Sequence, residues 1–263
     1  MIDARLLDAV GSLVTAHARP GHVPLIGIAG AQGSGKTTLA RLTAERLGAA
    51  HLSLDDVYLT KAEREEKGRA VHPMFAVRGP PGAHDLGLLE ATVAALRAAG
   101  PDSRTSLPAF DKLADDRRPQ AEWPLFAGRP SAVLVDGWCL GATAQAEADL
   151  TAPINALERE RDGQGAWRRT VNAELAGSYA ELFAGFDAIL FLKAPSFEAV
   201  LDWRCEQEAG LMGLAPAGLP AERRAALAVF IQAFERITRH MLAGGVRADV
   251  TFALDEHRRP FSP

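Results

Sequence analysis

One eight-residue segment, residues 30–37, limits what this chain can fold into more than any other part of the sequence. It runs Gly-Ala-Gln-Gly-Ser-Gly-Lys-Thr and matches the Walker A pattern G-x-x-x-x-G-K-[ST] at every fixed position. An apolar run at 24–30 precedes it and favours a buried strand, and residues 36–47 have the apolar spacing of a helix. A strand that passes through a glycine-rich loop into a helix is typical of a phosphate-binding loop, which predicts an α/β fold.

The residue types of this loop suit a nucleoside triphosphate and Mg²⁺. Glycines bring backbone N–H groups close to the phosphates, and the start of the helix presents further N–H groups and the positive end of its dipole. We expect Lys36 to reach the β- and γ-phosphates and Thr37 to ligate Mg²⁺ through its hydroxyl. ATP and Mg²⁺ are therefore the expected cofactors. The expected nucleotide-binding residues are Gly30, Ala31, Gln32, Gly33, Ser34, Gly35, Lys36, Thr37 and Thr38, the last as a helix-start residue.

Short apolar runs alternate with longer helical stretches along the rest of the chain. This alternation predicts βαβ units, a mostly parallel sheet covered on both faces, and so a three-layer α/β/α fold of the P-loop NTPase type. We expect one domain over 1–263, with an amphipathic helix within 1–20 packed on it and helical excursions at the active-site edge. The expected strands are 24–30, 51–54, 131–135, 188–192 and 250–254, and the expected helices are 36–47, 61–67, 85–98, 167–183, 197–209 and 221–242.

Composition narrows the class of protein further. The net charge of −4 offers no global basic field for nucleic acid, so no nucleic-acid partner is expected. The two cysteines cannot form a disulfide framework or a four-cysteine zinc site, and no apolar run approaches the roughly 20 residues that span a bilayer. We therefore expect a cytoplasmic protein without a membrane partner.

Aspartates follow two of the expected strands, where the carboxyl ends of parallel strands meet at one edge of the sheet. Asp55 and Asp56 come after 51–54, and Asp136 comes after 131–135. A carboxylate facing the γ-phosphate can accept a proton from an acceptor hydroxyl, and an acid at a strand end is the usual Mg²⁺ partner of a phosphate loop. The alternatives are a helix cap for Asp55 and a turn for Asp136. No N-K-x-D guanine-binding motif is present, which argues against a GTPase.

Five further segments follow one another in the order of the motifs of a known family. They are Ser-Leu-Asp-Asp-Val-Tyr-Leu-Thr at 53–60, Arg-Gly-Pro-Pro-Gly-Ala-His-Asp at 78–85, Pro-Ala-Phe-Asp-Lys at 108–112 with Asp-Asp-Arg at 115–117, Asp-Gly-Trp-Cys-Leu-Gly at 136–141, and Val-Leu-Asp-Trp-Arg at 200–204 with Gln-Glu at 207–208. Together with the phosphate loop they resemble the P-loop-type D-glycerate 3-kinase family, related to uridine kinase, phosphoribulokinase and bacterial pantothenate kinase. The resemblance runs from about Leu25 to Asp255.

This resemblance implies ATP-dependent phosphorylation of D-glycerate to 3-phosphoglycerate. Three positions depart from the family pattern: Asp136 stands for glutamate, Ala83 for threonine and Val57 for phenylalanine. The shorter acid affects its contact to Mg²⁺, and Ala83 removes a hydroxyl that could contact the substrate or the backbone.

The resemblance also implies roles for individual residues. Asp55 takes the place of the general base, with Asp56 as a cap or supporting residue, and Asp136 holds Mg²⁺ together with Thr37. Arg204 falls in the region of a mobile lid. We expect Trp203 and Phe197 to lie in the core, and Arg236 and Arg239 on the surface. The substrate-side candidates, any of which could instead be a solvated surface residue, are Arg78, His84, Asp111, Lys112 and Arg117.

Two other functions stay open at the level of sequence. The first is a kinase of another small alcohol, namely pantothenate, a nucleoside or a sugar; a nucleoside site would favour an aromatic stacking platform, and only 6% of the residues are aromatic. The second is a switch or chaperone that hydrolyses ATP slowly and binds a protein partner through an exposed apolar surface. The sequence does not identify protein partners.

Overall fold

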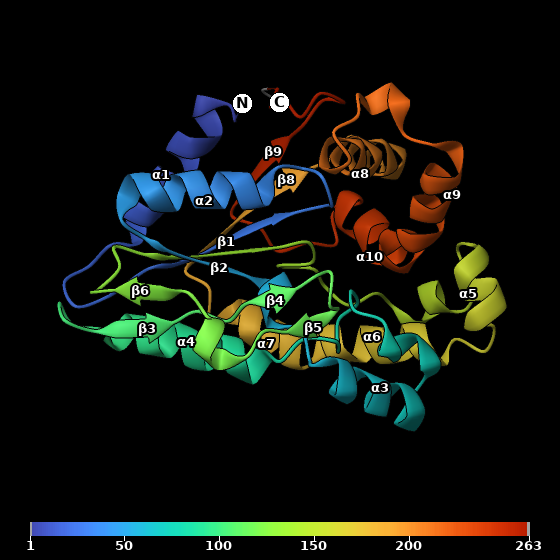
Figure 1. Cartoon of the computed structure of the whole chain (residues 1–263), viewed down its shortest axis with the longest axis horizontal. Coiled ribbons are helices and arrows are strands. Elements are labelled where there is room, and N and C mark those ends of the chain that lie inside the picture. Colours follow the sequence, from blue (N-terminus) through green and yellow to red (C-terminus); the bar gives the residue numbers. More distant parts are fainter. Residues whose placement is uncertain (1, 262–263) are drawn as a thin grey trace.

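The computed structural model describes residues 2–261 and is built around a five-stranded parallel sheet (Figure 1). The strand order is β2-β7-β1-β8-β9, so the strand that leads into the phosphate loop lies in the middle. Each neighbouring pair is parallel, as expected from the alternation of strands and helices. The strands are β1 (Leu25–Gly30), β2 (Ala50–Ser53), β7 (Val133–Gly137), β8 (Ala188–Lys193) and β9 (Val250–Ala253).

All five predicted strands are present, and their ends differ from prediction by at most two residues. The largest difference is at β7, which extends to Gly137. Asp136 therefore lies inside the last part of this strand, paired in register with Ile28 of β1 and Ser53 of β2. The backbone of Asp136 is held by strand pairing with β1 on one side and β2 on the other, so its side chain is placed more rigidly than it would be in a turn.

Two hydrophobic clusters cover the two faces of the sheet. Successive residues of a strand point to opposite faces, and in β1 Leu25 and Ala29 join one cluster while Ile26 and Ile28 join the other. Helices contribute to both clusters, so the predicted three-layer α/β/α architecture is confirmed (Figure 1). One face carries α1 (Ala4–His17), α2 (Lys36–Leu47) and α8 (Phe197–Leu211), and the other carries α4 (Leu86–Ala98), α6 (Ala166–Ala176), α7 (Ser178–Ala184) and α10 (Gln232–Leu242).

The N-terminal helix α1 packs on the sheet through one apolar stripe. Asp3 caps it by accepting a hydrogen bond from the Arg5 N–H (2.9 Å), and Leu6, Val10 and Val14 are buried at spacings of four residues. Met1 and residues 262–263, which belong to the expected domain, lie outside the described residues.

Two long helices predicted from apolar spacing are each divided in two. The predicted helix 167–183 breaks at Gly177 into α6 and α7, and the predicted helix 221–242 breaks at Ile231 into α9 (Ala221–Phe230) and α10. Ile231 is buried in the cluster on one face of the sheet, whereas Phe234 and Ile237 belong to the cluster on the other face. The chain therefore has to change direction at Ile231, and a local apolar period does not show this.

Helices and short antiparallel strands form the excursions from the central sheet. The prediction of helical excursions was incomplete, because two strand pairs of two or three residues each are also present. The predicted helix 61–67 is confirmed as α3 (Lys61–Ala70), whose start carries a capping box between Thr60 and Glu63. The remaining elements are α5 (Ala156–Arg161), β3 (Arg104–Ser106), β4 (Phe110–Asp111), β5 (Asp116–Arg117), β6 (Leu125–Ala127), and the short 3₁₀ helices η1 (Leu54–Val57), η2 (Pro73–Ala76), η3 (Gln120–Glu122), η4 (Glu147–Leu150) and η5 (Pro216–Gly218).

One of the two arginines predicted at the surface of α10 is buried. The Arg236 guanidinium pairs with both carboxylate oxygens of Glu158 (2.6 and 2.7 Å), and both side chains are almost fully buried. Arg239 is half exposed and pairs with Glu198 and Glu235, as expected for a surface residue. The Arg236 prediction was wrong because its partner comes from α5, 78 residues away in the sequence. Among residues 2–261, no helix has both the length and the apolar character that a membrane crossing needs.

Candidate active site

The phosphate loop connects β1 to α2, and its glycines meet specific steric demands. Gly33 and Gly35 have φ angles of +77° and +89°, in the left-handed region that favours glycine. A Cβ atom at Gly33 would lie 2.6 Å from the Cβ of Trp203, and one at Gly30 would lie 2.7 Å from the Ser34 hydroxyl oxygen. The loop is therefore closely packed as well as sharply turned, which fixes where its N–H groups point.

Several polar atoms in and next to this loop are available to a ligand. The Ser34 hydroxyl and the Gln32 side-chain carbonyl are buried and have no hydrogen-bond partner among the described residues. The Lys36 ammonium has one long hydrogen bond, to the Ala31 carbonyl (3.4 Å). Thr38 lies in the first turn of α2 with its side chain exposed. Buried polar groups are normally satisfied, and the Ser34 hydroxyl and the Lys36 ammonium can donate hydrogen bonds to a phosphate, whereas the Gln32 carbonyl oxygen needs a donor.

Asp136 joins the phosphate loop to the edge strand β2. One of its oxygens accepts a hydrogen bond from the Thr37 hydroxyl (2.7 Å), and the other contacts the Nε2 atom of His51 (2.7 Å). Asp136 is almost fully buried, whereas Thr37 opens toward solvent. No local sequence pattern marks His51 as a site residue, because its partner lies 85 residues away.

Thr37 and Asp136 together suit a magnesium ion. No group of three or more His, Cys, Asp or Glu side chains within 2–261 is arranged to hold a metal ion. Mg²⁺ does not need such a group, because it usually takes one or two protein oxygens and completes its shell with phosphate oxygens and water. A threonine hydroxyl beside a carboxylate, at the start of the phosphate-loop helix, is the pair that such a site requires.

Asp55 lies at the end of β2, within η1, and its carboxylate is held by two side chains. Lys112 donates to one oxygen (2.9 Å) and the Tyr58 hydroxyl donates to the other (3.1 Å). Burial acts to raise the pKa of Asp55, but the charges of Lys112 and Lys36 outweigh it and lower the pKa to about 2. Asp55 therefore stays ionised at neutral pH, within electrostatic reach of the lysine of the phosphate loop.

Asp56 differs from its neighbour Asp55 in environment and in the direction of its pKa shift. Burial raises the pKa of Asp56 to about 6, and the nearby charge of Asp55 adds to the effect. Its side chain accepts a weak hydrogen bond from the Phe110 N–H (3.4 Å). The side chain that caps η1 belongs to Ser53, which accepts a hydrogen bond from the Asp55 N–H (3.3 Å). The Asp55 side chain is thus directed at Lys112 and Tyr58 and does not cap the helix.

His84 lies in a buried aromatic stack behind Asp55. Its ring stacks on Tyr58 with 4.4 Å between the centroids, and its Nδ1 atom is 2.6 Å from the Tyr179 hydroxyl. Burial lowers the pKa of His84 to about 3, so the ring is neutral. Its Nε2 atom is buried and has no hydrogen-bond partner among the described residues.

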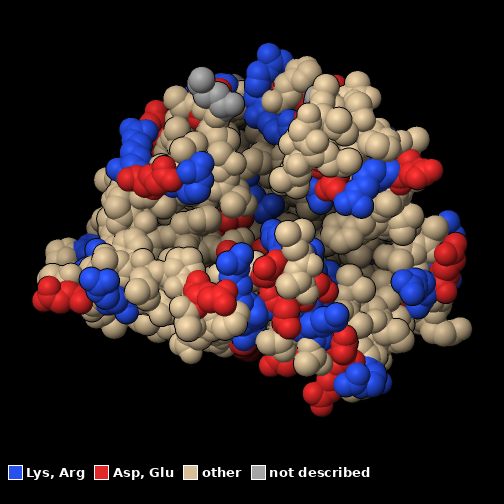
Figure 2. All heavy atoms as spheres, in the orientation of Figure 1, with Lys and Arg blue, Asp and Glu red and all other residues tan. Residues whose placement is uncertain are grey.

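The β4–β5 hairpin brings Lys112 to Asp55 and holds two arginines close to its own turn. Lys112, at the start of its turn, reaches Asp55, and Asp115 in the turn pairs with Arg78 and with the buried Arg64. Asp115 has a φ angle of +55°, which is uncommon for a residue with a side chain. Figure 2 shows the result as a hollow across this face of the molecule, with Lys and Arg side chains in it and acidic side chains near β4 and β5.

Two of the predicted substrate residues are engaged in holding the site together. The Asp111 carboxylate accepts hydrogen bonds from the N–H groups of Leu113 and Ala114 (2.8 and 3.0 Å), which shapes the hairpin turn. Arg117 donates to the Tyr58 carbonyl (2.8 Å) and to the Asp85 carboxylate (3.1 Å). Both residues therefore support the structure of the site, whereas Lys112 reaches Asp55, Arg78 pairs with Asp115, and the buried Nε2 atom of His84 has no partner among the described residues.

Solved structures show what this arrangement resembles. D-glycerate 3-kinase from Cryptococcus neoformans var. grubii serotype A has a TM-score of 0.79 and 22% sequence identity, over 99% of this chain and 99% of that chain. The YGR205w protein has a TM-score of 0.69 and 20% identity, over 98% of this chain and 96% of that chain. No protein-family model matches the sequence, and the comparison with curated proteins finds no match either. The chain has the fold of a P-loop kinase.

Arg204, the predicted lid arginine, lies on α8 of this kinase fold but is turned to its own helix. Its guanidinium pairs with Glu208 (3.0 Å), which also pairs with Arg223 (2.5 Å). Its neighbour Trp203 is buried in the core, as predicted, and packs against Gly33 of the phosphate loop. The helix α8 therefore contacts the phosphate loop through Trp203, whereas the next residue, Arg204, pairs with Glu208 of its own helix.

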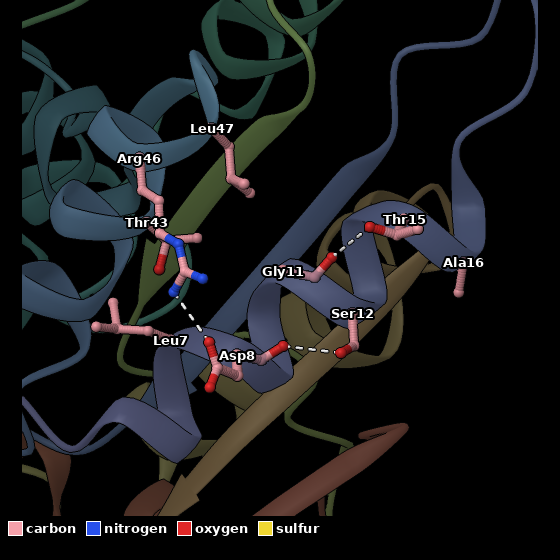
Figure 3. Close-up of a pocket in the computed structure, with 9 residues that line it drawn as sticks. All are labelled: Leu7, Asp8, Gly11, Ser12, Thr15, Ala16, Thr43, Arg46 and Leu47. Carbon is pink, nitrogen blue, oxygen red and sulfur yellow. Dashed lines mark hydrogen bonds and ion pairs between the residues drawn. The ribbon is translucent and has the colours of Figure 1, made fainter.

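A second hollow lies between α1 and α2 and is separate from this site. Its volume is about 540 Å³, and Figure 3 shows Asp8 and Arg46 paired across it (2.9 Å). The α2 residues that line it are Thr43, Arg46 and Leu47, at the opposite end of the helix from the phosphate loop. A helix rises about 1.5 Å per residue, so this hollow is roughly 10–15 Å from the loop.

Proposed function

We propose that this protein uses ATP and Mg²⁺ to phosphorylate a hydroxyl group of a small hydroxy acid. D-glycerate, converted to 3-phosphoglycerate, is the leading candidate. The sequence motifs that resemble D-glycerate 3-kinases support this proposal, and so does the similarity to a solved structure of that name. A cytoplasmic location is part of the proposal, since Cys139 and Cys205 are both buried free thiols.

The observation that carries the proposal is the contact between Asp55 and Lys112 beside the phosphate loop. The charge of Lys36 also lowers the pKa of this carboxylate, so the proposed base lies within electrostatic reach of the phosphate-binding lysine and in contact with a substrate-side cation. An acceptor hydroxyl next to Asp55 would be close to the γ-phosphate. Lys112 and Arg78 then offer two cations for a carboxylate on the same small molecule.

Asp55 is proposed to accept the proton of the acceptor hydroxyl. With a pKa of about 2 it is a weak base while Lys112 is bound to it. We propose that the acceptor carboxylate draws Lys112 away from Asp55. Burial would then act on Asp55 with less opposition and raise its pKa toward the working pH, where a general base is more effective.

Lys36 and the loop N–H groups would hold the β- and γ-phosphates in line with the acceptor hydroxyl. Thr37 and Asp136 would hold the magnesium ion. When bound, Mg²⁺ supplies positive charge that neutralises the phosphate oxygens during transfer.

His84 is proposed to donate a hydrogen bond to an oxygen of the acceptor. The Tyr179 hydroxyl oxygen accepts a hydrogen bond from the Gly82 N–H (2.9 Å) and lies 2.6 Å from Nδ1 of His84, and in the proposed arrangement the Tyr179 O–H donates to Nδ1. A neutral ring that accepts at Nδ1 carries its proton at Nε2. That buried N–H has no acceptor among the described residues, and a substrate hydroxyl or carboxylate oxygen would satisfy it.

An ADP-release assay with a panel of acceptors tests this proposal. The panel contains D-glycerate, pantothenate, uridine, a hexose and water alone, each at the same MgATP concentration. We expect release to rise above the water background most strongly with D-glycerate. A stronger response to a neutral alcohol would favour the pantothenate, nucleoside or sugar alternative. Equal release with every acceptor and with water would contradict a metabolite kinase and favour a slow ATPase.

A further inference from the structure

The C-terminal turn that follows β9 contacts the phosphate loop directly. Arg258 donates from its Nε atom to the Gly33 carbonyl (2.6 Å), across 225 residues of sequence. The same guanidinium lies 5.1 Å from the centre of the Trp203 ring and pairs with Glu206 (2.7 Å). One side chain therefore connects the loop with two residues of α8.

The contact fixes a peptide group at the tip of the loop. The carbonyl of the Gly33–Ser34 peptide bonds to Arg258, and its N–H bonds to the Ala31 carbonyl (3.2 Å). A planar peptide held at both ends cannot rotate, so the N–H groups that follow keep their orientation. Those following residues, Gly35 to Thr37, carry the N–H groups at the start of α2.

The turn itself is built to present Arg258. The Arg258 N–H bonds to the Asp255 carbonyl (2.9 Å), and the Trp203 indole N–H bonds to the Glu256 carbonyl (2.6 Å). Arg258 has a φ angle of +63°, a conformation that glycine adopts more easily than arginine. A side chain is therefore present at a position where the backbone alone favours glycine, which indicates that its contacts offset the strain.

We propose that Arg258 is a positioning residue for nucleotide binding. It acts through the Gly33 carbonyl and pre-orients the loop N–H groups for the phosphates, and it links the loop to α8, which carries Arg204. The inference rests on the proposed binding of a nucleotide at the loop and does not depend on the identity of the acceptor.

The test is the affinity of the protein for MgADP, measured by calorimetry for the wild type and four variants. Loss of a hydrogen bond to a charged group predicts that Arg258→Ala weakens MgADP binding about tenfold. Arg258→Gly should weaken it as much, although glycine suits the backbone better, and Arg258→Lys should restore part of the affinity. Arg259→Ala is the matched control, because Arg259 is in the same turn, is exposed and pairs with Asp255 (2.8 Å). In turnover assays the KM for ATP should rise while the KM for the acceptor stays the same.

Wild-type affinity in Arg258→Ala would overturn the inference. So would wild-type affinity in Arg258→Gly, because the backbone of the turn would then matter and the side chain would not. If the wild-type protein does not bind MgADP, this inference and the proposed function both fail. If it binds MgADP with the expected differences among variants but phosphorylates no acceptor, the inference stands and the proposed function fails alone.

Discussion

The phosphate loop and the β4–β5 hairpin each bring a lysine that acts on Asp55, and different kinds of interaction hold the two segments in place. The loop is shaped by its own backbone, through glycines with positive φ and close packing against Trp203. The hairpin is held by ion pairs between side chains that are distant in sequence, Lys112 with Asp55 and Asp115 with Arg78. The nucleotide side is thus pre-formed, whereas the charges of the acceptor side are already paired with each other.

This difference indicates how an acceptor could bind. The Lys112 side chain is 59% exposed, so a substrate carboxylate can reach its ammonium group. A carboxylate that replaces Asp55 as the partner of Lys112 provides a new ion pair, while the loss of the old one raises the pKa of Asp55. If the proposed function holds, the protein would bind nucleotide without acceptor, and Asp55 would become a stronger base only when an anionic acceptor draws Lys112 away from it.

The largest effect on turnover should come from a change at Asp55, the carboxylate on which both the nucleotide side and the acceptor side of the site act. Asp55→Asn keeps the shape of the side chain but removes the proton acceptor, so kcat should fall by about 10²–10⁴ with MgADP affinity unchanged. Steady-state kinetics and calorimetry on the same sample measure both. Asp56→Asn is the matched control, and its kcat should fall much less than that of Asp55→Asn. Unchanged turnover in Asp55→Asn would remove this residue from the chemistry.

A smaller effect is expected from an arginine on the acceptor side. Arg78→Ala removes one cation offered to the acceptor carboxylate, so the KM for D-glycerate should rise about 10–100-fold while the KM for ATP stays the same. Arg118→Ala is the control, since this half-exposed arginine lies 3.8 Å from Asp111 and outside the proposed contacts. An equal rise in both KM values would show that Arg78 supports the fold of the whole site.

On the nucleotide side, His51 should tune the metal site. His51→Ala leaves one oxygen of Asp136 without its partner, so the Mg²⁺ concentration for half-maximal activity should rise about tenfold. His22→Ala is the matched control, because His22 pairs with Asp187 in a similar way (3.0 Å) but at the other end of the sheet. Equal Mg²⁺ requirements in the wild type and in His51→Ala would separate Asp136 from metal binding.

The smallest predicted change is a shift in pH dependence. Asp55 must be ionised to accept a proton, so activity is present above its pKa and is lost as the pH falls through that value. Lys112 holds the pKa of Asp55 low, at about 2, which puts this loss below the usual assay range. Lys112→Met should raise the pKa and move the acid limb of kcat/KM upward by about 1 to 3 pH units. Lys61→Met, at an exposed lysine, should leave the profile unchanged; an unshifted limb in Lys112→Met would mean that the ion pair does not control Asp55.

Features that depend on local sequence, such as the phosphate loop, could be predicted, whereas contacts between distant residues, such as those of the β4–β5 hairpin, could not. The strands, the phosphate loop, and the placing of Asp55 and Asp136 at one edge of the sheet follow from local patterns, because each depends on residues close together in the chain. Parallel strands then bring their carboxyl ends together by topology. These features can therefore be predicted from the sequence alone.

Contacts over long sequence distances were not predictable in this way. The His51–Asp136 pair and the Arg258–Gly33 hydrogen bond join residues 85 and 225 positions apart. The local sequence spacing of Arg236 is that of a surface residue, but in the fold Glu158 of α5 packs against it and pairs with it. The two-residue strands β4 and β5 are too short to show an apolar period, although their hairpin shapes the acceptor side.

The most direct test of the account is to identify the product formed from ATP and D-glycerate. Mass spectrometry of a reaction with the wild-type protein should show a phosphoglycerate that accumulates in a one-to-one ratio with ADP. The same reaction with Asp55→Asn should show almost none. ADP that accumulates without any phosphorylated acid, in equal amounts with and without glycerate, would contradict the account.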